Sequence, residues 1–182
     1  MNACELTEEE FNELLRLSRL YHREAKRCMA AKSYLAGCVM IGAALEASLM
    51  SMCHLYADEI PGDLLPKNKT KQKPLLQWTL AQLLRVARNC GWLPTGLALD
   101  DDWNRRKAKI GDYAVVLKEI RNLVHPGVYM TDFPKSRMTK RRLEWCFEIF
   151  EVATDHLLAK VYASIRKSLA EEERGNLESD DT

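Results

Sequence analysis

Residues 33–57 constrain the fold of this chain most strongly, because Glu46 is the only formal charge there apart from a possible one on His54. The stretch is rich in alanine and glycine and contains no proline. Its length would just cross a bilayer, which takes ~20 residues. Glu46 lies in the middle and Ser48 follows closely, however, so we favour burial inside a protein over a membrane span. The stretch predicts a central helix over about 33–56 that other helices cover on several sides.

An N-terminal partner for this central helix is predicted by a local start signal. Thr7 followed by Glu10 forms a Ser/Thr-x-x-Glu capping box. Phe11 and Leu14 begin an apolar face with helical spacing, and the helix is expected to end near Ala30. Because only a short connection then leads to the central helix, the two helices are predicted to form a long antiparallel hairpin.

The rest of the chain predicts further helices separated by loops. Three prolines, one glycine and several lysines indicate a solvated loop over 61–75. A second capping box begins at Thr79 and starts a short helix that Gly91 ends. A fourth helix is expected over 112–124 and a last one over 139–169. The last helix is expected to bury one side, whose members include Leu143, Cys146, Phe147, Phe150, Val152, Leu157, Leu158 and Val161.

The helical patterns along the chain, together with its sparse glycine and proline, predict the all-α class and a single bundle of about five helices. Hydrophobic residues make up 47%, charged residues 29%, and there are only 8 glycines and 6 prolines. Residues 1–170 are expected to form this domain, and the acidic residues 171–182 a disordered tail. Without that tail, 26 basic and 20 acidic residues leave a net charge of +6, which suits contact with a polyanion.

Cysteine usage favours a reducing compartment. None of the six cysteines has CxxC spacing, and Cys28, Cys38 and Cys53 fall in predicted helices. We therefore expect reduced, mostly buried thiols in a cytoplasmic protein, with no metal site and no cofactor. Acidic residues near the start, among them Glu5 and Glu8, replace the basic-then-apolar order of a signal peptide.

The most informative motif closes the fourth predicted helix. Arg121-Asn122-Leu123-Val124-His125 precedes Pro126, which pushes the residue before it out of helical geometry. At 100° per residue, Lys118, Arg121 and His125 share one flank of the apolar stripe. Imidazole exchanges protons near neutral pH, and guanidinium binds phosphate through a two-pronged fork. These residue types suit metal-independent cleavage of RNA, in which Asn122 orients the histidine or the phosphate.

A helical hairpin with Ala-Leu-Glu at 44–46, followed by a helix that ends in Arg-Asn-x-x-His, resembles the HEPN superfamily of helical bundles. The resemblance implies a homodimer in which two copies of the motif meet. It also implies RNA as substrate, and metal-independent endoribonuclease activity in a toxin–antitoxin or phage-defence setting. A cognate antitoxin or another defence-system protein is then an expected partner.

The chain departs from the family pattern in its spacing, and this keeps a second interpretation open. Four to six residues usually separate the arginine from the histidine, whereas three separate Arg121 from His125 and six separate Lys118 from His125. In the alternative, Arg121 pairs with Glu46, an acid on an apolar helix, and His125 caps its helix. The chain is then a catalytically silent module for protein interaction or dimerisation. The two interpretations are compatible, because Glu46 can also orient Arg121.

Basic residues on both sides of the motif helix are the predicted RNA-binding surface. Clustered cations of this kind supply the sequence-independent part of nucleic-acid affinity, although a solvated surface accounts for them as well. The residues assigned to this surface are Arg105, Arg106, Lys107, Lys109, Arg137 and Arg141.

Overall fold

The computed structural model of the chain describes residues 3–93 and 139–180. Four α-helices dominate these residues: α1 (Glu8–Ala30), α2 (Tyr34–Leu55), α3 (Leu80–Asn89) and α7 (Lys140–Asp180). Two 3-10 turns and one hairpin complete the described part: η1 (Ala57–Glu59), β1 (Lys67–Asn68), β2 (Lys71–Gln72) and η2 (Leu75–Gln77). The all-α prediction is confirmed. The fourth predicted helix, 112–124, lies outside the described residues, so a bundle of five stays a prediction.

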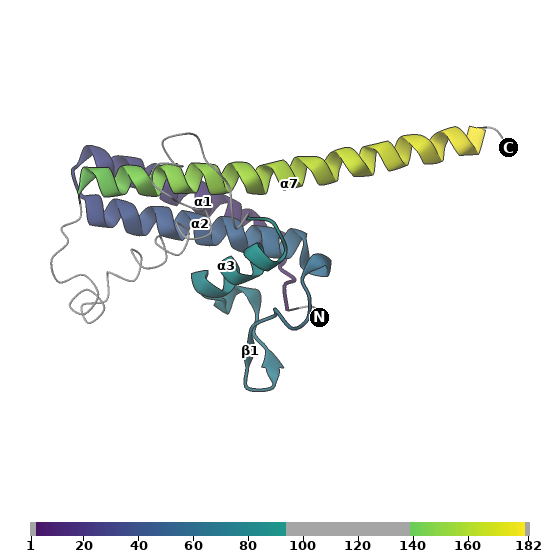
Figure 1. Cartoon of the computed structure of the whole chain (residues 1–182), viewed down its shortest axis with the longest axis horizontal. Helices are drawn as coiled ribbons and strands as arrows, with labels where there is room; N and C mark the ends of the chain where they lie inside the picture. Colours follow the sequence, from purple (N-terminus) through teal and green to yellow (C-terminus); the bar gives the residue numbers. More distant parts are fainter. Residues whose placement is uncertain (1–2, 94–138, 181–182) are drawn as a thin grey trace.

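Helices α1 and α2 form the predicted antiparallel hairpin (Figure 1). The capping box is present: the Thr7 hydroxyl accepts from the backbone N–H of Glu10 at 3.2 Å, and the Glu10 carboxylate accepts from that of Thr7 at 2.9 Å. At the other end, Lys32 has a φ of 58°, in the left-handed region, and reverses the chain between the helices. Both bounds of α1 match the sequence prediction, and the capping box that sets its start acts within one turn of the chain.

Helix α2 is the centre of the molecule. Ile41, Leu45 and Leu49 are fully buried, and α1, α3 and α7 all pack against this helix. By length and hydropathy alone, α2 is long and apolar enough to cross a membrane, but 61% of its apolar window is buried inside the protein. The prediction of a central helix covered on several sides is confirmed.

Polar residues at the α1–α2 contact are paired with each other. Ser18 interrupts the apolar face of α1, and its hydroxyl lies 2.8 Å from that of Ser48 on α2. The Ser48 hydroxyl also donates to the carbonyl of Ala44 at 3.0 Å, one turn earlier. A hydroxyl satisfied in this way removes the penalty of burying a polar group between helices.

Helix α7 runs in the same direction as α2. Cys38 contacts Cys146 near the start of both helices, and Tyr56 lies beside Lys160 towards the other end. Close approach at the start depends on Gly37. A Cβ atom at this position would lie 2.5 Å from Cδ2 of Leu143 and 3.3 Å from Cβ of Cys28. The missing side chain therefore lets α1, α2 and α7 converge at this point.

The segment between α2 and α3 contains more structure than the predicted loop. Strands β1 and β2 pair antiparallel, with Lys67 opposite Gln72 and both strands exposed. Leu75 is buried, and its backbone N–H donates to the carbonyl of Ala3 at 3.0 Å. The turn residues carry none of the glycine or asparagine signals of a tight hairpin, which is why the sequence did not predict these strands.

The predicted short helix and both of its ends are confirmed in α3. The Thr79 hydroxyl accepts from the backbone of Gln82 at 3.4 Å, and Gly91 follows the helix with a φ of 70°. Glycine adopts this left-handed conformation without strain, so it ends a helix cleanly.

Helix α7 is longer than the helix predicted over 139–169 and continues to Asp180, into the acidic residues for which a disordered tail was predicted. The helix crosses the predicted boundary at 170 without a break and extends past the other helices (Figure 1). Ala170 and the glutamates that follow are strong helix formers, and the Lys167 ammonium lies 3.8 Å from the Glu171 carboxylate.

Its buried side also differs from the prediction, most of all at Leu158, and Phe147, Val152 and Val161 are only partly buried. Leu143, Cys146, Phe150 and Leu157 are buried as expected. Leu158, however, is 50% exposed, because it lies about 100° around the helix from Leu157, which contacts the core.

Candidate functional site

Most of the predicted site lies outside the described residues. This holds for the proposed catalytic residues Arg121, Asn122 and His125 and for the supporting Lys118. It also holds for most of the predicted RNA-binding surface, namely Arg105, Arg106, Lys107, Lys109 and Arg137. The described residues include the remaining two members, Glu46 and Arg141.

Glu46 lies in the middle of α2 and is partly buried. Its neighbours Leu45 and Ala47 are buried, so the carboxylate stands at the edge of the core. Its predicted pairing with Arg121 involves a residue outside the described part and stays a prediction.

Arg141 lies exposed in the first turn of α7. Its guanidinium carbon is 5.3 Å from the ring centroid of Trp145, one turn further along. An aromatic face at this distance attracts a cation and holds the planar guanidinium in place. Lys140 and Arg142 flank Arg141, although a helix N-terminus disfavours cations. The first turn of α7 holds three cations and no acid, although the Lys140 ammonium lies 3.3 Å from the Glu144 carboxylate one turn further on.

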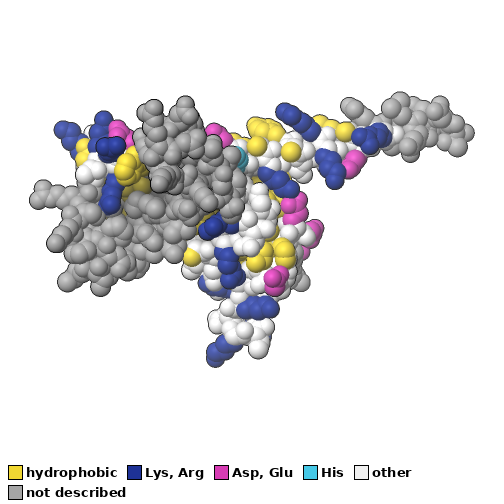
Figure 2. Space-filling view, in the orientation of Figure 1, with side chains coloured by type: hydrophobic (Ala, Val, Ile, Leu, Met, Phe, Trp, Pro, Cys, Tyr) yellow, Lys and Arg dark blue, Asp and Glu magenta, His cyan; other side chains and the backbone are white. Residues whose placement is uncertain are grey.

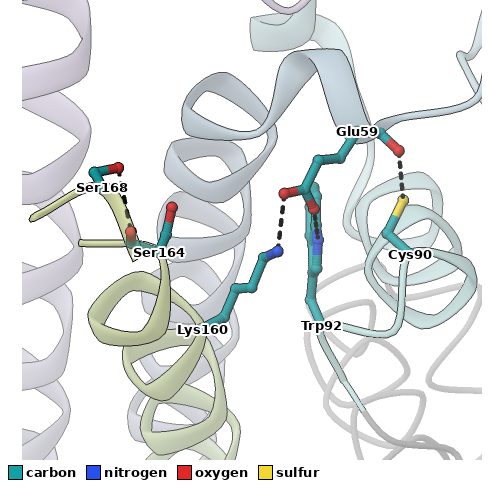
Figure 3. Close-up of polar contacts among 6 residues, drawn as sticks. All are labelled: Glu59, Cys90, Trp92, Lys160, Ser164 and Ser168. Atoms are coloured by element: carbon teal, nitrogen blue, oxygen red, sulfur yellow. Dashed lines mark hydrogen bonds and ion pairs between the residues drawn. The ribbon is translucent and has the colours of Figure 1, made fainter. Parts of the chain in front are cut away.

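Sequence reasoning missed a cluster centred on Glu59, which follows α2 (Figure 3). Its carboxylate lies 2.8 Å from the Lys160 ammonium of α7 and 3.5 Å from Nε1 of Trp92. The thiol of Cys90 donates to the Glu59 carbonyl at 3.9 Å, and burial and then Glu59 raise the pKa of this thiol. The cluster joins η1, the end of α3 and α7. Because it links residues about a hundred positions apart, no local pattern in the sequence could reveal it.

The cluster links three elements of the fold through polar contacts. Lys160 also lies over the ring of Tyr56 at 4.8 Å, so its charge is already engaged on two sides. The Lys160 and Glu59 side chains are 34% and 45% exposed, and ion pairs that open to water contribute little to stability.

All six cysteines are free thiols, as predicted, and Cys4, Cys38, Cys53 and Cys146 are buried. Burial raises the pKa of Cys4 to about 11 and raises that of Cys53 further. The thiol of Cys146 donates to the sulfur of Cys38 at 3.7 Å, which raises the pKa of Cys146 and lowers that of Cys38. Protonated, enclosed thiols behave as small apolar residues, so these cysteines fill the core.

His22 is a partly buried histidine of α1 that packs against α7. Its ring centroid lies 5.8 Å from that of Phe147 and 5.0 Å from that of Phe150. Its Nε2 atom is buried and has no hydrogen-bond partner among the described residues. Burial and then the nearby charge of Lys26 lower the pKa of His22 from its ordinary value of 6.5, while Glu151 opposes the shift.

This environment predicts a loss of stability in acid. Because the folded pKa of His22 lies below the unfolded value, the unfolded chain binds the proton more readily, so stability rises with pH through that window. The contribution of the neutral His22 side chain to the free energy of unfolding is complete above about pH 6.5, and it is lost as the pH falls below that value. Thermal melts between neutral pH and about pH 5 are expected to show a smaller decline in Tm for His22→Gln than for the wild type. Parallel declines in the two proteins would contradict this assignment.

An apolar groove lies between α1, α2 and α7. It has a volume of about 400 Å³, and its lining includes Phe11, Leu15, Leu55 and Leu158. Arg19 lies at its edge on α1. The part of the chain that the structure describes holds no group of three or more histidine, cysteine, aspartate or glutamate side chains arranged for a metal ion.

These features define an all-α protein with a central apolar helix, a polar tie at Glu59 and a basic start to α7. Comparisons with protein-family models, curated proteins and solved structures found no match. The functional assignment therefore depends on the residues themselves.

Proposed function

We propose that the chain is a HEPN-like, RNA-binding protein that cleaves RNA without a metal ion. The observation that carries the proposal is the motif Arg121-Asn122-x-x-His125 at the expected end of a helix. Its setting in a mostly helical chain with an N-terminal antiparallel hairpin supports it. The net charge of +6 over residues 1–170 suits a polyanionic substrate.

The chemistry uses the RNA's own 2′-hydroxyl as the nucleophile. His125 removes the proton of the 2′-hydroxyl as the 2′-oxygen attacks the adjacent phosphorus. A histidine then returns a proton to the 5′-oxygen that leaves. Arg121 holds the phosphate oxygens through two parallel hydrogen bonds and stabilises the charge that develops there. Asn122 orients the imidazole or the phosphate. The products are a 2′,3′-cyclic phosphate and a 5′-hydroxyl.

Substrate binding is assigned to the basic residues around the motif. Arg141 is the described member, and its stacking on Trp145 presents the guanidinium at the surface. We propose a cytoplasmic homodimer in a toxin–antitoxin or phage-defence setting, with a cognate antitoxin or defence-system protein as a further partner.

A catalytically silent interaction module is the second candidate function. Two observations favour it: only three residues separate Arg121 from His125, and α7 carries a row of exposed apolar residues (Figure 2). The row consists of Leu158, Tyr162, Ile165 and Leu169. On this reading Arg121 and Glu46 stabilise the bundle, and the exposed surface of the helix binds a protein.

One experiment separates the two candidates. Purified protein is incubated with total cellular RNA in EDTA, and the ends of the products are identified. The ribonuclease proposal expects cleavage in the chelator, with 2′,3′-cyclic phosphate and 5′-hydroxyl ends. Intact RNA at protein concentrations that give a dimer would support the silent module, and 5′-phosphate ends would contradict the proposed chemistry.

A further inference from the structure

Two buried thiols on different helices are in direct contact. Cys38 of α2 and Cys146 of α7 are 108 positions apart in the sequence, and both side chains are fully buried. Their sulfur atoms lie 3.7 Å apart, and the Cys146 thiol donates its hydrogen to the Cys38 sulfur. The two sulfur atoms therefore touch without a covalent bond.

Helices α2 and α7 approach closely beside this pair because Gly37 has no side chain. Gly37 directly precedes Cys38, and Leu143 lies about one turn before Cys146. A Cβ atom on Gly37 would be 2.5 Å from Cδ2 of Leu143. The sulfur atoms of a disulfide are ~2.0 Å apart, so those of the two cysteines have to approach by roughly 1.7 Å. Rotation of the two side chains about their Cα–Cβ bonds can move the sulfur atoms by this much.

We infer that Cys38 and Cys146 form a site of reversible oxidation, at which hydrogen peroxide converts the two thiols into a disulfide bond between α2 and α7. A dithiol such as dithiothreitol returns the two hydrogens and restores the reduced pair. The inference goes beyond the proposed function. It uses none of the residues that the proposed RNA chemistry needs.

The surroundings give the two thiols different roles. The hydrogen bond from Cys146 lowers the pKa of Cys38, and the positive charge of Arg142 acts in the same direction against the effect of burial. The same hydrogen bond and then burial raise the pKa of Cys146. Because the thiolate is the reactive form, Cys38 is assigned as the sulfur that attacks the peroxide and Cys146 as the one that completes the disulfide.

The reaction balances in two steps. The Cys38 thiolate attacks one oxygen of the peroxide, the O–O bond breaks, and the other oxygen leaves as hydroxide, which takes up the proton that the thiol lost. Cys38 is then a sulfenic acid. The Cys146 sulfur attacks the Cys38 sulfur, the S–O bond breaks, and the leaving hydroxide takes the Cys146 proton. Two thiols thus give up two electrons and two protons, and the peroxide becomes two waters.

The position of the pair near the start of both helices gives the oxidant access. Helices α2 and α7 begin at the same end of the molecule (Figure 1), at Tyr34 and Lys140, four and six residues before the two cysteines. Helix ends open more readily than helix centres, so a small peroxide reaches the sulfur atoms when a first turn opens. Full burial at other times predicts that oxidation is slow compared with that of an exposed thiol.

The disulfide is expected to raise the Tm of the protein by about 5–15 °C. It closes a covalent loop between positions 108 apart, and a long loop removes much conformational freedom from the unfolded chain. Thermal melts of the oxidised and the reduced protein measure the difference. An equal or lower Tm after oxidation would mean that the bond distorts the packing of α2 against α7, which contradicts the geometry on which the inference depends.

Mass mapping tests the site on the full chain. The reduced protein is exposed to hydrogen peroxide in native buffer, its remaining thiols are alkylated, and it is digested after lysine, arginine and glutamate. Cleavage after Glu46 separates Cys38 from Cys53, so the linked peptides identify the partners. We expect a Cys38–Cys146 link, a protein mass lower by two hydrogen atoms, and loss of the link after treatment with dithiothreitol.

Serine variants supply the controls. Cβ of Cys28 would lie 3.3 Å from a Cβ atom on Gly37, so Cys28→Ser is the matched control and is expected to form the bond as the wild type does. Cys146→Ser is expected to stop at the sulfenic acid of Cys38, which dimedone captures. Linkage of Cys38 to Cys28 would overturn the inference, as would oxidation of Cys28 and Cys90 alone or a bond that forms only in urea. The mapping of the wild type stands whether or not a variant folds, and it involves no RNA.

Discussion

The His125→Ala variant is expected to cleave RNA about 10²–10⁴-fold more slowly than the wild type, the usual loss when a general acid–base is removed. Alanine leaves the 2′-hydroxyl without a positioned proton acceptor while the rest of the chain is unchanged. Initial rates on one defined oligonucleotide in EDTA measure the effect. Circular dichroism must show that the variant retains the helical content of the wild type.

Two arginine variants distinguish catalysis from binding. Arg121→Lys is expected to lower kcat strongly, because an ammonium replaces the two-pronged contact of the guanidinium with a point charge. Arg141→Ala is expected mainly to raise KM, since its proposed contact is with the RNA backbone before and during the reaction. A His125→Ala variant with the wild-type rate would remove the motif from the mechanism, whatever the arginine variants do.

The sequence predicted those helices whose limits are set by neighbouring residues. Thr7 and Thr79 start α1 and α3 through capping boxes, and Gly91 ends α3, all as predicted. Each signal acts over about one turn of the chain, so it is readable without knowledge of the fold. The central position of α2 was also predictable, because a helix that is apolar nearly all round needs neighbours on several sides.

Features that depend on distant residues were not predictable in the same way. The contact of Cys38 with Cys146 and the tie between Glu59 and Lys160 join segments about a hundred residues apart. Local pattern does not specify which residue of one helix meets which residue of another. The same limit applies to the candidate site. The motif identifies Arg121 and His125, but it does not specify which groups from distant parts of the chain surround them.

The exposed row on α7 shows a different kind of limit. Its spacing was present in the sequence, and Leu158 was assigned to the buried side together with Leu157. An apolar residue at helical spacing predicts a contact, but it does not say whether the partner belongs to the same chain. The length of α7 explains why the row is exposed. A helix that extends past the rest of its bundle carries part of its apolar surface away from the core.

The Gly37→Val substitution is expected to lower the free energy of unfolding by about 3 kcal/mol, at the upper end of the usual cost of overpacking. A Cβ atom here would lie 2.5 Å from Cδ2 and 3.0 Å from Cδ1 of the fully buried Leu143. On the other side Cβ of Cys28 is 3.3 Å away, so a side chain at this position meets both α1 and α7. Helix propensity slightly favours valine over glycine, so any loss must come from packing.

A second substitution tests whether Leu143 is the cause. Leu143→Ala alone is expected to cost about 2–5 kcal/mol, because it leaves a cavity in the core. In the double variant the valine occupies part of that cavity, so the combined loss is expected to fall short of the sum by at least about 1 kcal/mol. Urea unfolding of the four proteins measures this difference, with Gly62→Val, where a Cβ meets nothing within 4 Å, as the matched control. Additive losses would mean that Gly37 is needed for a reason other than the approach of Leu143, whereas a shortfall identifies this contact as what sets the spacing of α2 and α7.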